Sequence, residues 1–524
     1  MTTHMRPAPL PTLALAGIGS AALYGAAVLR FPLLAIYNHP LQNLDKLTGS
    51  APLVGLALST GVLLLFLGYA LGALALLHTE RIGTVARLTI IGLPFVFVAL
   101  LVFVYPTTSL DVYDYLFRGR MAVHYHVNNF VAVPADFPTD PLMASSPFRF
   151  VPWSRAVTAY GPIWELVSHA TAWLAGERPE RTPVAIDPSL QHLMFGYKAL
   201  GALGFVVCGA VLWGALGVIA PARRWFGLYL WLWNPLALWE SVAAAHNDAW
   251  MAAAIVAACW SFALFVRPPA GQLRGAVGAF VALTVGGLIK YFALIFSPLM
   301  LTAALRRLPT WRARVQFVAI SVTICALLVA LAYAPFWVGM GTLRNFGDRG
   351  TLFYASWLAA LQAGLHESGW LAKDVAQRAV ASLATALLGL GVAWSAWRGW
   401  REPERVVAHA TWLLLWFLLV ANPWFQPWYL LWALALAALQ PDRPRLVMAV
   451  IVFCATAMLS YSAGSFLLPA LKWSGEGVAW NLLLSALIYG LPLLVLVVAQ
   501  RQARSLQHAL RVKCGKPTEI GTLR

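Results

Sequence analysis

The sequence predicts an all-α fold, a polytopic bundle of transmembrane helices, and three observations lead to it. Hydrophobic residues make up 60% of the 524-residue chain and charged residues only 11%, and the mean hydropathy is +0.72. Apolar runs of about 20 residues, the length that a helix needs to cross a bilayer, recur along the chain. No long polar block separates them. We therefore expect residues 1–524 to form a single integral-membrane domain.

Positive charge gathers in short clusters between the apolar runs. The chain has 37 Lys and Arg against 20 Asp and Glu, a formal net charge of +17. Such clusters are typical of cytoplasmic loops and of surfaces that meet anionic lipid headgroups. We expect membrane lipid to be the partner of these charges, and no nucleic acid.

The cysteines exclude two further classes. There are five, and most of them lie inside apolar runs. No CxxC or Cys/His spacing occurs, so the sequence supports neither a disulfide framework nor a zinc site. It leaves a divalent metal open without supporting one, and we predict no cofactor.

The chain is expected to begin with three spans, at residues 13–37, 52–77 and 88–105. The first apolar stretch is longer than a signal-peptide core and should be retained as a helix. The link 78–87 contains Arg81 and Arg87 and should be cytoplasmic, which places the residues after 105 outside. The Ala-, Leu-, Trp- and Arg-rich composition suggests a bacterial inner membrane.

Residues 106–190 form the longest segment without a span, and we predict an ordered extracytoplasmic catalytic loop. Its prolines should divide it into short helices and extended pieces. Residues 160–174 are amphipathic and aromatic, which is typical of an interfacial helix. Loops of this length are usually functional or disordered, and the aromatic content favours order.

Eleven more spans are expected after residue 190, about fourteen in total, with both termini cytoplasmic. They cover residues 191–219, 225–243, 249–266, two short helices within 275–305, 315–338, 374–397, 406–421, a partner that ends before Asp442, 446–468 and 480–499. Residues 339–373 should form a second extracytoplasmic loop, and residues 501–524 a basic cytoplasmic tail.

The stretch 109–119, read as S-L-D-V-Y-D-Y-L-F-R-G, places two acids where the chain leaves the membrane. Asp111 and Asp114 lie three residues apart beside Tyr113. Acids favour the first turn of a helix, which is one interpretation. The other is a general base held above the lipid surface, with Asp111 in that role.

A second polar group follows a predicted kink at Pro235. Glu240 lies within the span, and His246, Asn247 and Asp248 follow at its outer turn. Asn247 or Asp248 could be the N-cap of the next helix, but a cap does not explain Glu240. Glu240 and His246 could share a proton or orient each other. Metal-ligand spacing is absent here.

Lys290 follows a Gly-Gly pair at the predicted break between two short helices. It is either a snorkelling lysine or a point charge for a phosphate. Arg349 and Arg344 in the second outer loop compete for that phosphate role. Lys198, in the middle of an apolar run, is predicted to pair with Glu165 or Glu240.

Aromatic and polar residues complete the group of candidate site residues on the predicted outer side of the membrane. The turn 422–429 belongs either to the interfacial belt or to a surface for sugar rings and isoprenoid chains. The expected sugar or lipid contacts are Tyr160, Gln426, Trp428 and Tyr429. Ionisable groups at membrane depth cost about 3 kcal/mol each and by default mark a site or pathway. All of these groups are predicted to lie on the same side of the membrane, and this shared location is stronger evidence for a site than any one of them.

Several of these stretches together resemble a known family. They are S-L-D-V-Y-D-Y-L-F-R-G-R, N-N-F-x-x-x-P at 128–134, Y-G-P-I-W at 160–164, N-P-L-A-L-W-E followed by A-H-N-D, L-I-K-Y-F-A-L, and N-P-W-F-Q-P-W-Y-L-L-W. In this order they resemble the GT-C class of glycosyltransferases, and more narrowly the bacterial polyprenyl-phosphate-mannose-dependent mannosyltransferases. Two positions depart from the pattern: Asn129 and Phe130 stand where Pro-Tyr is frequent, and Arg118 where an acid is common.

The resemblance implies an inverting transfer of a sugar, most simply mannose, from a polyprenyl phosphate to a glycan or glycolipid hydroxyl on the outer face. Asp111 would take the acceptor proton, with Asp114, Tyr113 and Asn247 in support. Lys290 or Arg349 would bind the departing phosphate, and His246 and Asp248 would orient a substrate. The isoprenoid tail would lie in a groove open to lipid. No nucleotide-binding loop is needed.

Two other classes fit the same composition. A lipid-linked-sugar flippase or secondary transporter also needs intramembrane charges and broken helices, but such carriers usually place their sites near the midplane and have repeated halves. A non-catalytic assembly subunit would not require the acid pair. The crowding of polar groups at the outer surface favours an enzyme.

Overall fold

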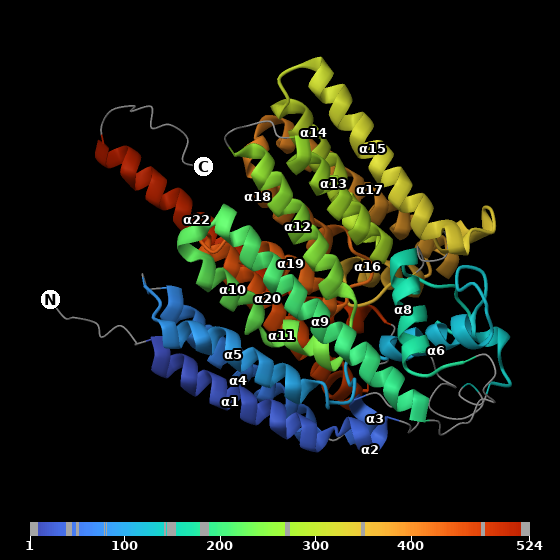
Figure 1. Cartoon of the computed structure of the whole chain (residues 1–524). Coiled ribbons are helices and arrows are strands. Elements are labelled where there is room, and N and C mark those ends of the chain that lie inside the picture. Colours follow the sequence, from blue (N-terminus) through green and yellow to red (C-terminus); the bar gives the residue numbers. More distant parts are fainter. Residues whose placement is uncertain are drawn as a thin grey trace.

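The computed structural model describes residues 9–37, 44–48, 52–77, 79, 81–140, 143, 153–178, 188–267, 273–346, 352–472 and 477–514. Within these ranges the regular elements are helices, and the β pairing consists of three isolated bridges. The predicted all-α class is confirmed. Long helices run side by side, and α6 (Asp111–His124) and α8 (Pro162–Leu174) gather at one end of the bundle (Figure 1).

Ten helices in the described ranges are long and apolar enough to cross a membrane. They are α1 (Pro9–Arg30), α4 (Pro52–Leu77), α5 (Thr84–Leu101), α9 (Pro188–Ile219), α12 (Asp248–Val266), α15 (Trp311–Tyr333), α17 (Lys373–Arg401), α18 (Val406–Trp416), α20 (Pro444–Ser462) and α22 (Val478–Cys514). α18 reaches spanning length together with its flanking turns, over Pro403–Ala421. The chain is therefore a multi-pass membrane protein. The figure of fourteen stays a prediction, because the other four expected spans are short or interrupted helices.

Those four are α10 (Arg224–Leu232) with α11 (Pro235–Leu238), α13 (Leu273–Ile289), α14 (Ser297–Arg307) and α19 (Leu430–Ala438). Four minor helices are α2 (Leu33–Ile36), α3 (Leu44–Thr48), α16 (Trp357–Glu367) and α21 (Leu468–Ala470). The N-terminal end of α1 and the C-terminal end of α22 both lie away from α6 and α8 (Figure 1). The cap formed by α6 and α8 is thus at the opposite end of the bundle from the start of α1 and the end of α22.

Asp111 begins a separate helix, which corrects the expectation that it lies where a spanning helix leaves the membrane. α5 ends at Leu101, and a connector, residues 102–110, follows it. Pro106 in the connector has no N–H to continue a helix. The connector is pinned to the end of α1, because Tyr105 N–H donates to the Phe31 carbonyl at 2.9 Å. This contact fixes where α6 starts.

A buried polar network holds the cap together. Arg118 Nε donates to Asp114 Oδ2 at 2.8 Å, and the Asn129 amide donates to Glu165 Oε2 at 2.7 Å. Thr158 donates its hydroxyl to the other Glu165 oxygen and accepts from the Tyr160 N–H at 3.2 Å. Buried charges persist only when paired and hydrogen-bonded in this way. The network therefore positions α6 and Tyr160 together.

A second buried cluster ties the end of α6 to the remainder of the described cap. Arg120 pairs with Asp140 at 2.9 Å and with Glu177 at 2.9 Å, and Tyr125 donates its hydroxyl to Asp140 at 2.7 Å. The described parts of residues 106–190 contain α6, α8 and these ion pairs, and an ordered catalytic loop over the whole segment stays a prediction. Its residues 141–142, 144–152 and 179–187 lie outside the described ranges.

The predicted kink at Pro235 is confirmed. α10 ends at Leu232, and the Asn234 side chain caps α11 by accepting from the Leu236 and Ala237 N–H groups, a strong start signal. A π-helical turn at Trp239–Ala243 then follows, and such turns are frequent at functional sites. It turns Glu240 into the bundle.

The predicted break at Lys290 is also confirmed. α13 ends at Ile289, Lys290 has an extended backbone, and a 3₁₀ turn at Tyr291–Phe296 leads into α14. The cap docks on this break, since Gly161 N–H donates to the Ile289 carbonyl at 2.9 Å. A Cβ at Gly161 would come within 2.2 Å of the Leu288 carbonyl oxygen, so only glycine allows this approach.

The prediction for Lys198 is wrong. Its buried ammonium donates to the Val104 carbonyl at 2.6 Å and to the Ala243 carbonyl, not to Glu165 or Glu240. Carbonyls at helix ends lack an intrahelical donor, and Ala243 ends the π-helical turn. Lys198 therefore joins the connector that leads to Asp111 to the turn that carries Glu240.

Candidate active site

Asp111 lies at the inner edge of the cap, facing the broken helices. It is the first residue of α6, and its backbone N–H donates to Ser109 Oγ at 3.1 Å. Its side chain is 16% exposed, and Oδ2 lies 3.9 Å from His246 Nδ1. The carboxylate is thus within reach of both the protein interior and a ligand.

His246 lies between two carboxyl groups. Its Nε2 is 3.3 Å from Glu240 Oε2, and Tyr461 on α20 donates its hydroxyl to Glu240 Oε1 at 2.9 Å. The imidazole stacks on the Trp428 ring with centroids 4.1 Å apart. Asp111, His246, Glu240 and Tyr461 therefore form one line that runs from the cap into the bundle.

Asp248 and Lys290 form a tight ion pair beside this line. Lys290 Nζ lies 2.8 and 2.9 Å from the two Asp248 oxygens, and the Asp248 side chain is fully buried. The ammonium also lies 5.9 Å from the ring centroid of Tyr160, 5.4 Å from that of Tyr429 and 5.6 Å from that of Trp432. Aromatic faces stabilise a cation at such distances.

Burial shifts the pKa of Asp111 and the pKa of His246, which face each other. Burial raises the pKa of the Asp111 carboxyl; His246 and Lys290 oppose this, whereas Asp114 and Asp248 add to it. Burial lowers the pKa of His246 to about 4, so its imidazole is neutral near pH 7. A neutral imidazole carries one N–H and can donate to only one of its two carboxyl neighbours.

The structure brings most of the predicted site residues together. They are Asp111, Tyr160, Glu240, His246, Asp248, Lys290, Trp428 and Tyr429. Gln426 lines an adjacent cavity. Asn247 is fully buried next to them, and its side chain does not cap α12; neither of its amide atoms has a hydrogen-bond partner among the described residues.

Two predicted residues, Asp114 and Tyr113, lie apart from this cluster, and two others fall outside what the structure describes. Asp114 pairs with Arg118 in the cap network, and the Tyr113 hydroxyl donates to the Tyr37 carbonyl at 3.4 Å. Arg349 lies outside the described residues, as does the side chain of Arg344. Tyr461 and Trp432 were not predicted as site residues. The one signal for them in the sequence is a polar aromatic side chain inside an apolar run.

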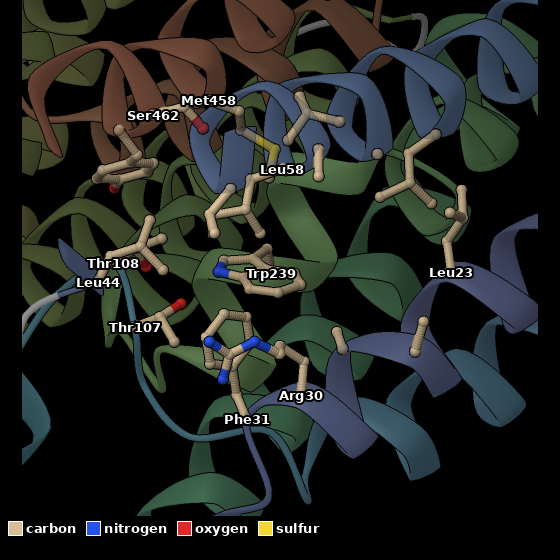
Figure 2. Close-up of a pocket in the computed structure, with 18 of the residues that line it drawn as sticks. Leu23, Arg30, Phe31, Leu44, Leu58, Thr107, Thr108, Trp239, Met458 and Ser462 are labelled. Atoms are coloured by element: carbon tan, nitrogen blue, oxygen red, sulfur yellow. The ribbon is translucent and has the colours of Figure 1, made fainter. Parts of the chain in front are cut away.

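Two cavities adjoin the cluster. One has a volume of about 720 Å³ and is lined by Ser109 and Leu110, next to Asp111, and by Trp424 and Gln426. The other, of about 460 Å³, is almost wholly apolar and lies between α1, α4 and α20 (Figure 2). They share Leu44, Thr107, Thr108 and Tyr461 as a common wall.

The described acidic, histidine and cysteine side chains do not form a metal-binding cluster. No group of three or more His, Cys, Asp and Glu side chains within the described ranges is arranged to hold a metal ion. Lys290 occupies the position beside Asp248 that a cation would take.

Comparisons with known proteins identify relatives over most of the chain. Residues 12–306 match the family described as alpha-(1→6)-mannopyranosyltransferase, N-terminal domain, and residues 354–489 match the MptB C-terminal domain. The alpha-(1→6)-mannopyranosyltransferase A of Mycobacterium tuberculosis is 26% identical over 415 residues, which cover 76% of this chain and 74% of that protein. No solved structure matches. The first matched region contains Asp111, His246 and Lys290, and the second contains Trp428 and Tyr461.

Proposed function

Because this chain belongs to the alpha-(1→6)-mannopyranosyltransferase family, we propose that it transfers mannose from a polyprenyl phosphate, with Asp111 as general base. The chain is a mannosyltransferase, which requires a mannose donor and a glycan acceptor. The finer parts of the proposal are the lipid nature of the donor, a glycan or glycolipid hydroxyl as acceptor, the role of Asp111 and the side of the membrane.

The proposed reaction needs one proton acceptor and one leaving group. The acceptor hydroxyl oxygen forms a bond to the anomeric carbon as the bond from that carbon to the phosphate oxygen breaks. The electron pair of the broken bond stays on the polyprenyl phosphate, and the hydroxyl proton moves to Asp111. A phosphate leaves readily, so no acid has to protonate it. Attack opposite the leaving group inverts the anomeric centre.

In this proposal His246 and Glu240 lie on the protein side of Asp111 and orient its carboxylate. A neutral imidazole that donates from Nδ1 toward Asp111 presents a bare Nε2 to Glu240. Glu240 then carries a proton, donates it to Nε2 and accepts the Tyr461 hydroxyl with its other oxygen. This arrangement keeps Asp111 ionised and oriented before the acceptor arrives, as preorganised sites require.

Replacing Glu240 tests its protonation state. Glutamine has the shape of a protonated glutamic acid, with one donor and one acceptor, so Glu240→Gln should keep transfer close to that of the unchanged chain. Glu240→Leu removes the group that faces His246 Nε2 and accepts from the Tyr461 hydroxyl, and it should lower kcat by roughly tenfold or more. Steady-state transfer rates of both variants measure this. Equal losses in the two variants would mean that Glu240 acts as a carboxylate.

The pH dependence follows from the raised pKa of Asp111. A base works only when it is deprotonated, so kcat/KM should rise with pH through that pKa and level off above it. Because burial raises the pKa, the acidic limb should lie above the usual range of an aspartate. The measurement is a pH profile of kcat/KM. In the control His246→Gln the limb should remain and move to higher pH, because His246 opposes the rise of the Asp111 pKa. A profile that is flat down to the ordinary aspartate range would contradict the assignment.

Lys290 and its aromatic neighbours would act on the sugar phosphate. Two N–H groups of the ammonium face Asp248, and a third is left for a phosphate or sugar oxygen. Tyr160, Trp428 and Tyr429 provide ring faces suited to a mannose ring, and Asn247 offers both a donor and an acceptor. Arg349 stays a candidate for the phosphate.

We place the reaction on the outer face of a bacterial inner membrane, with both termini cytoplasmic and about fourteen crossings. Basic residues lie at the end of the bundle where α14 and α17 end, as at Arg306, Arg307, Arg398 and Arg401. That distribution favours this end as cytoplasmic. The cap and Asp111 would then be extracytoplasmic.

The convergence of Asp111, Glu240, His246 and the Asp248–Lys290 pair from separate elements is the observation that carries the proposal. It is tested by incubating the purified full chain with radiolabelled polyprenyl-phosphate mannose and a mannoside acceptor. Transfer with formation of an α-(1→6) linkage is expected. Transfer from a nucleotide sugar and none from the lipid donor would overturn it.

A further inference from the structure

The apolar cavity contains one basic side chain, and it lies at the wall that this cavity shares with the polar one. Arg30 is the last residue of α1 and the only Lys or Arg among the described residues that line either cavity. Figure 2 shows its guanidinium on the same side of the cavity as Thr107, close to Trp239. Leu23 and Leu58 lie farther along the apolar part.

Arg30 keeps its charge available. Its Nη2 donates to the Leu47 carbonyl at 3.4 Å, near the limit for a hydrogen bond, and the guanidinium lies 5.3 Å from the Phe31 ring centroid. No carboxylate among the described side chains forms an ion pair with it. Lys290, in contrast, is neutralised by both oxygens of a buried Asp248.

The apolar cavity has the character of a lipid-chain groove. Its wall combines the small residues Ala57 and Gly61 of α4 with the bulky residues Leu23, Leu58 and Met458. Polyprenyl chains are branched and purely apolar, so such a wall fits them through contact area alone. A ligand with an apolar chain and an anionic head would match this groove and Arg30 together.

From this arrangement we infer that Arg30 binds the phosphate of the polyprenyl donor, with the first isoprene units in the groove between α1, α4 and α20. The inference rests on the proposed function, which it deepens by assigning the donor site. Arginine suits a phosphate because its planar guanidinium donates two parallel hydrogen bonds. The sugar would then extend over Thr107 and Thr108 into the polar cavity beside Asp111, and the glycan acceptor would approach past Trp424 and Gln426.

The phosphate contact is tested by binding without catalysis. The probes are undecaprenyl phosphate, which carries no sugar, and undecaprenol, which lacks the phosphate, added to the full chain in nanodiscs and followed by native mass spectrometry. Arg30→Gln should raise the Kd for undecaprenyl phosphate roughly 10- to 100-fold and leave undecaprenol unchanged. Arg30→Lys should restore part of the affinity. Arg378→Gln, an exposed arginine outside the cavity, is the matched control and should bind normally.

Two other outcomes would contradict either the Arg30 assignment or the proposed lipid donor. Unchanged binding in Arg30→Gln would overturn the assignment, most clearly if the double variant Lys290→Gln/Asp248→Asn lost the phosphate probe instead. If the unchanged chain bound neither undecaprenyl phosphate nor undecaprenol, the proposed lipid donor itself would be wrong. The two failures are therefore distinguishable.

The groove is tested by filling it. A Cβ at Gly61 meets no heavy atom within 4 Å, so Gly61→Phe can place its ring in the groove without a clash at the backbone. It should abolish binding of both probes. Gly19 on the exposed side of α1 also has no neighbour within 4 Å, so Gly19→Phe is the control and should bind both. Normal probe binding in Gly61→Phe would contradict a chain in this groove.

Discussion

Replacement of Asp111 by asparagine is expected to reduce mannosyl transfer by roughly 10²- to 10⁴-fold, the contribution of a general base. The substitution keeps the size of the side chain and its acceptor oxygen but removes the group that takes the proton. Because the Asp111 carboxylate forms no hydrogen bond to the cap within the described part of the chain, the folded structure should persist. The measurement is kcat for transfer, together with the thermal unfolding midpoint in detergent.

The matched control is Asp374→Asn. Asp374 is an acid in the first turn of α17, exposed, and paired with Arg378. Transfer should not change in this control. Turnover in Asp111→Asn equal to that of the control would exclude Asp111 as the base, and a large fall in its unfolding midpoint would assign it a structural role instead.

The second large effect is expected at the Asp248–Lys290 pair. Asp248→Ala leaves the Lys290 ammonium without its counter-charge, and removing one partner of a buried pair costs about 3–5 kcal/mol of folding free energy. Activity should be lost as well. The double variant Asp248→Asn/Lys290→Gln removes both charges, so it should recover most of the stability without recovering transfer.

A double-mutant cycle separates these two roles. The free energies of unfolding of Asp248→Asn, of Lys290→Gln and of the double variant that combines these two substitutions are measured by denaturation in detergent, alongside transfer rates. A coupling energy near zero would show that the pair does not stabilise the fold. Full transfer in the double variant would show that the site does not use the charge of Lys290.

The sequence predicted the elements whose signals are local. The break at Lys290 follows a Gly-Gly pair, and the kink before Pro235 follows from the missing N–H of proline. The gathering of Asp111, His246, Asp248 and Lys290 was predictable because alternating spans return their turns to the same side. The family followed from an ordered series of short motifs, and the comparisons confirm it.

Which side chains of the site contact each other depends on tertiary packing and was not predictable from the sequence. Lys290 meets Asp248 because the end of α13 lies beside the start of α12, 42 residues away along the chain. Lys198 contacts carbonyls freed at the ends of other elements, a partner that leaves no mark in a sequence. Tyr461 reaches Glu240 across 221 residues, and nothing near Tyr461 in the sequence indicates that contact.

The proposed membrane topology is what makes Arg30 a candidate for ligand binding. In the sequence it is one arginine near an apolar run. With α1 crossing from the cytoplasm, it would lie at the outer end of a span, where the positive-inside tendency disfavours it. A basic residue at that position beside an apolar groove therefore calls for an anionic partner.

The most direct measurement is an experimentally determined structure of the Asp111→Asn variant with polyprenyl-phosphate mannose and a mannoside acceptor bound. The expected result places the anomeric carbon in the cavity beside residue 111, the acceptor hydroxyl within hydrogen-bonding distance of its side chain, and the phosphate at Arg30. A mannose bound at the opposite end of the bundle, or an acceptor hydroxyl beyond the reach of residue 111, would contradict the account.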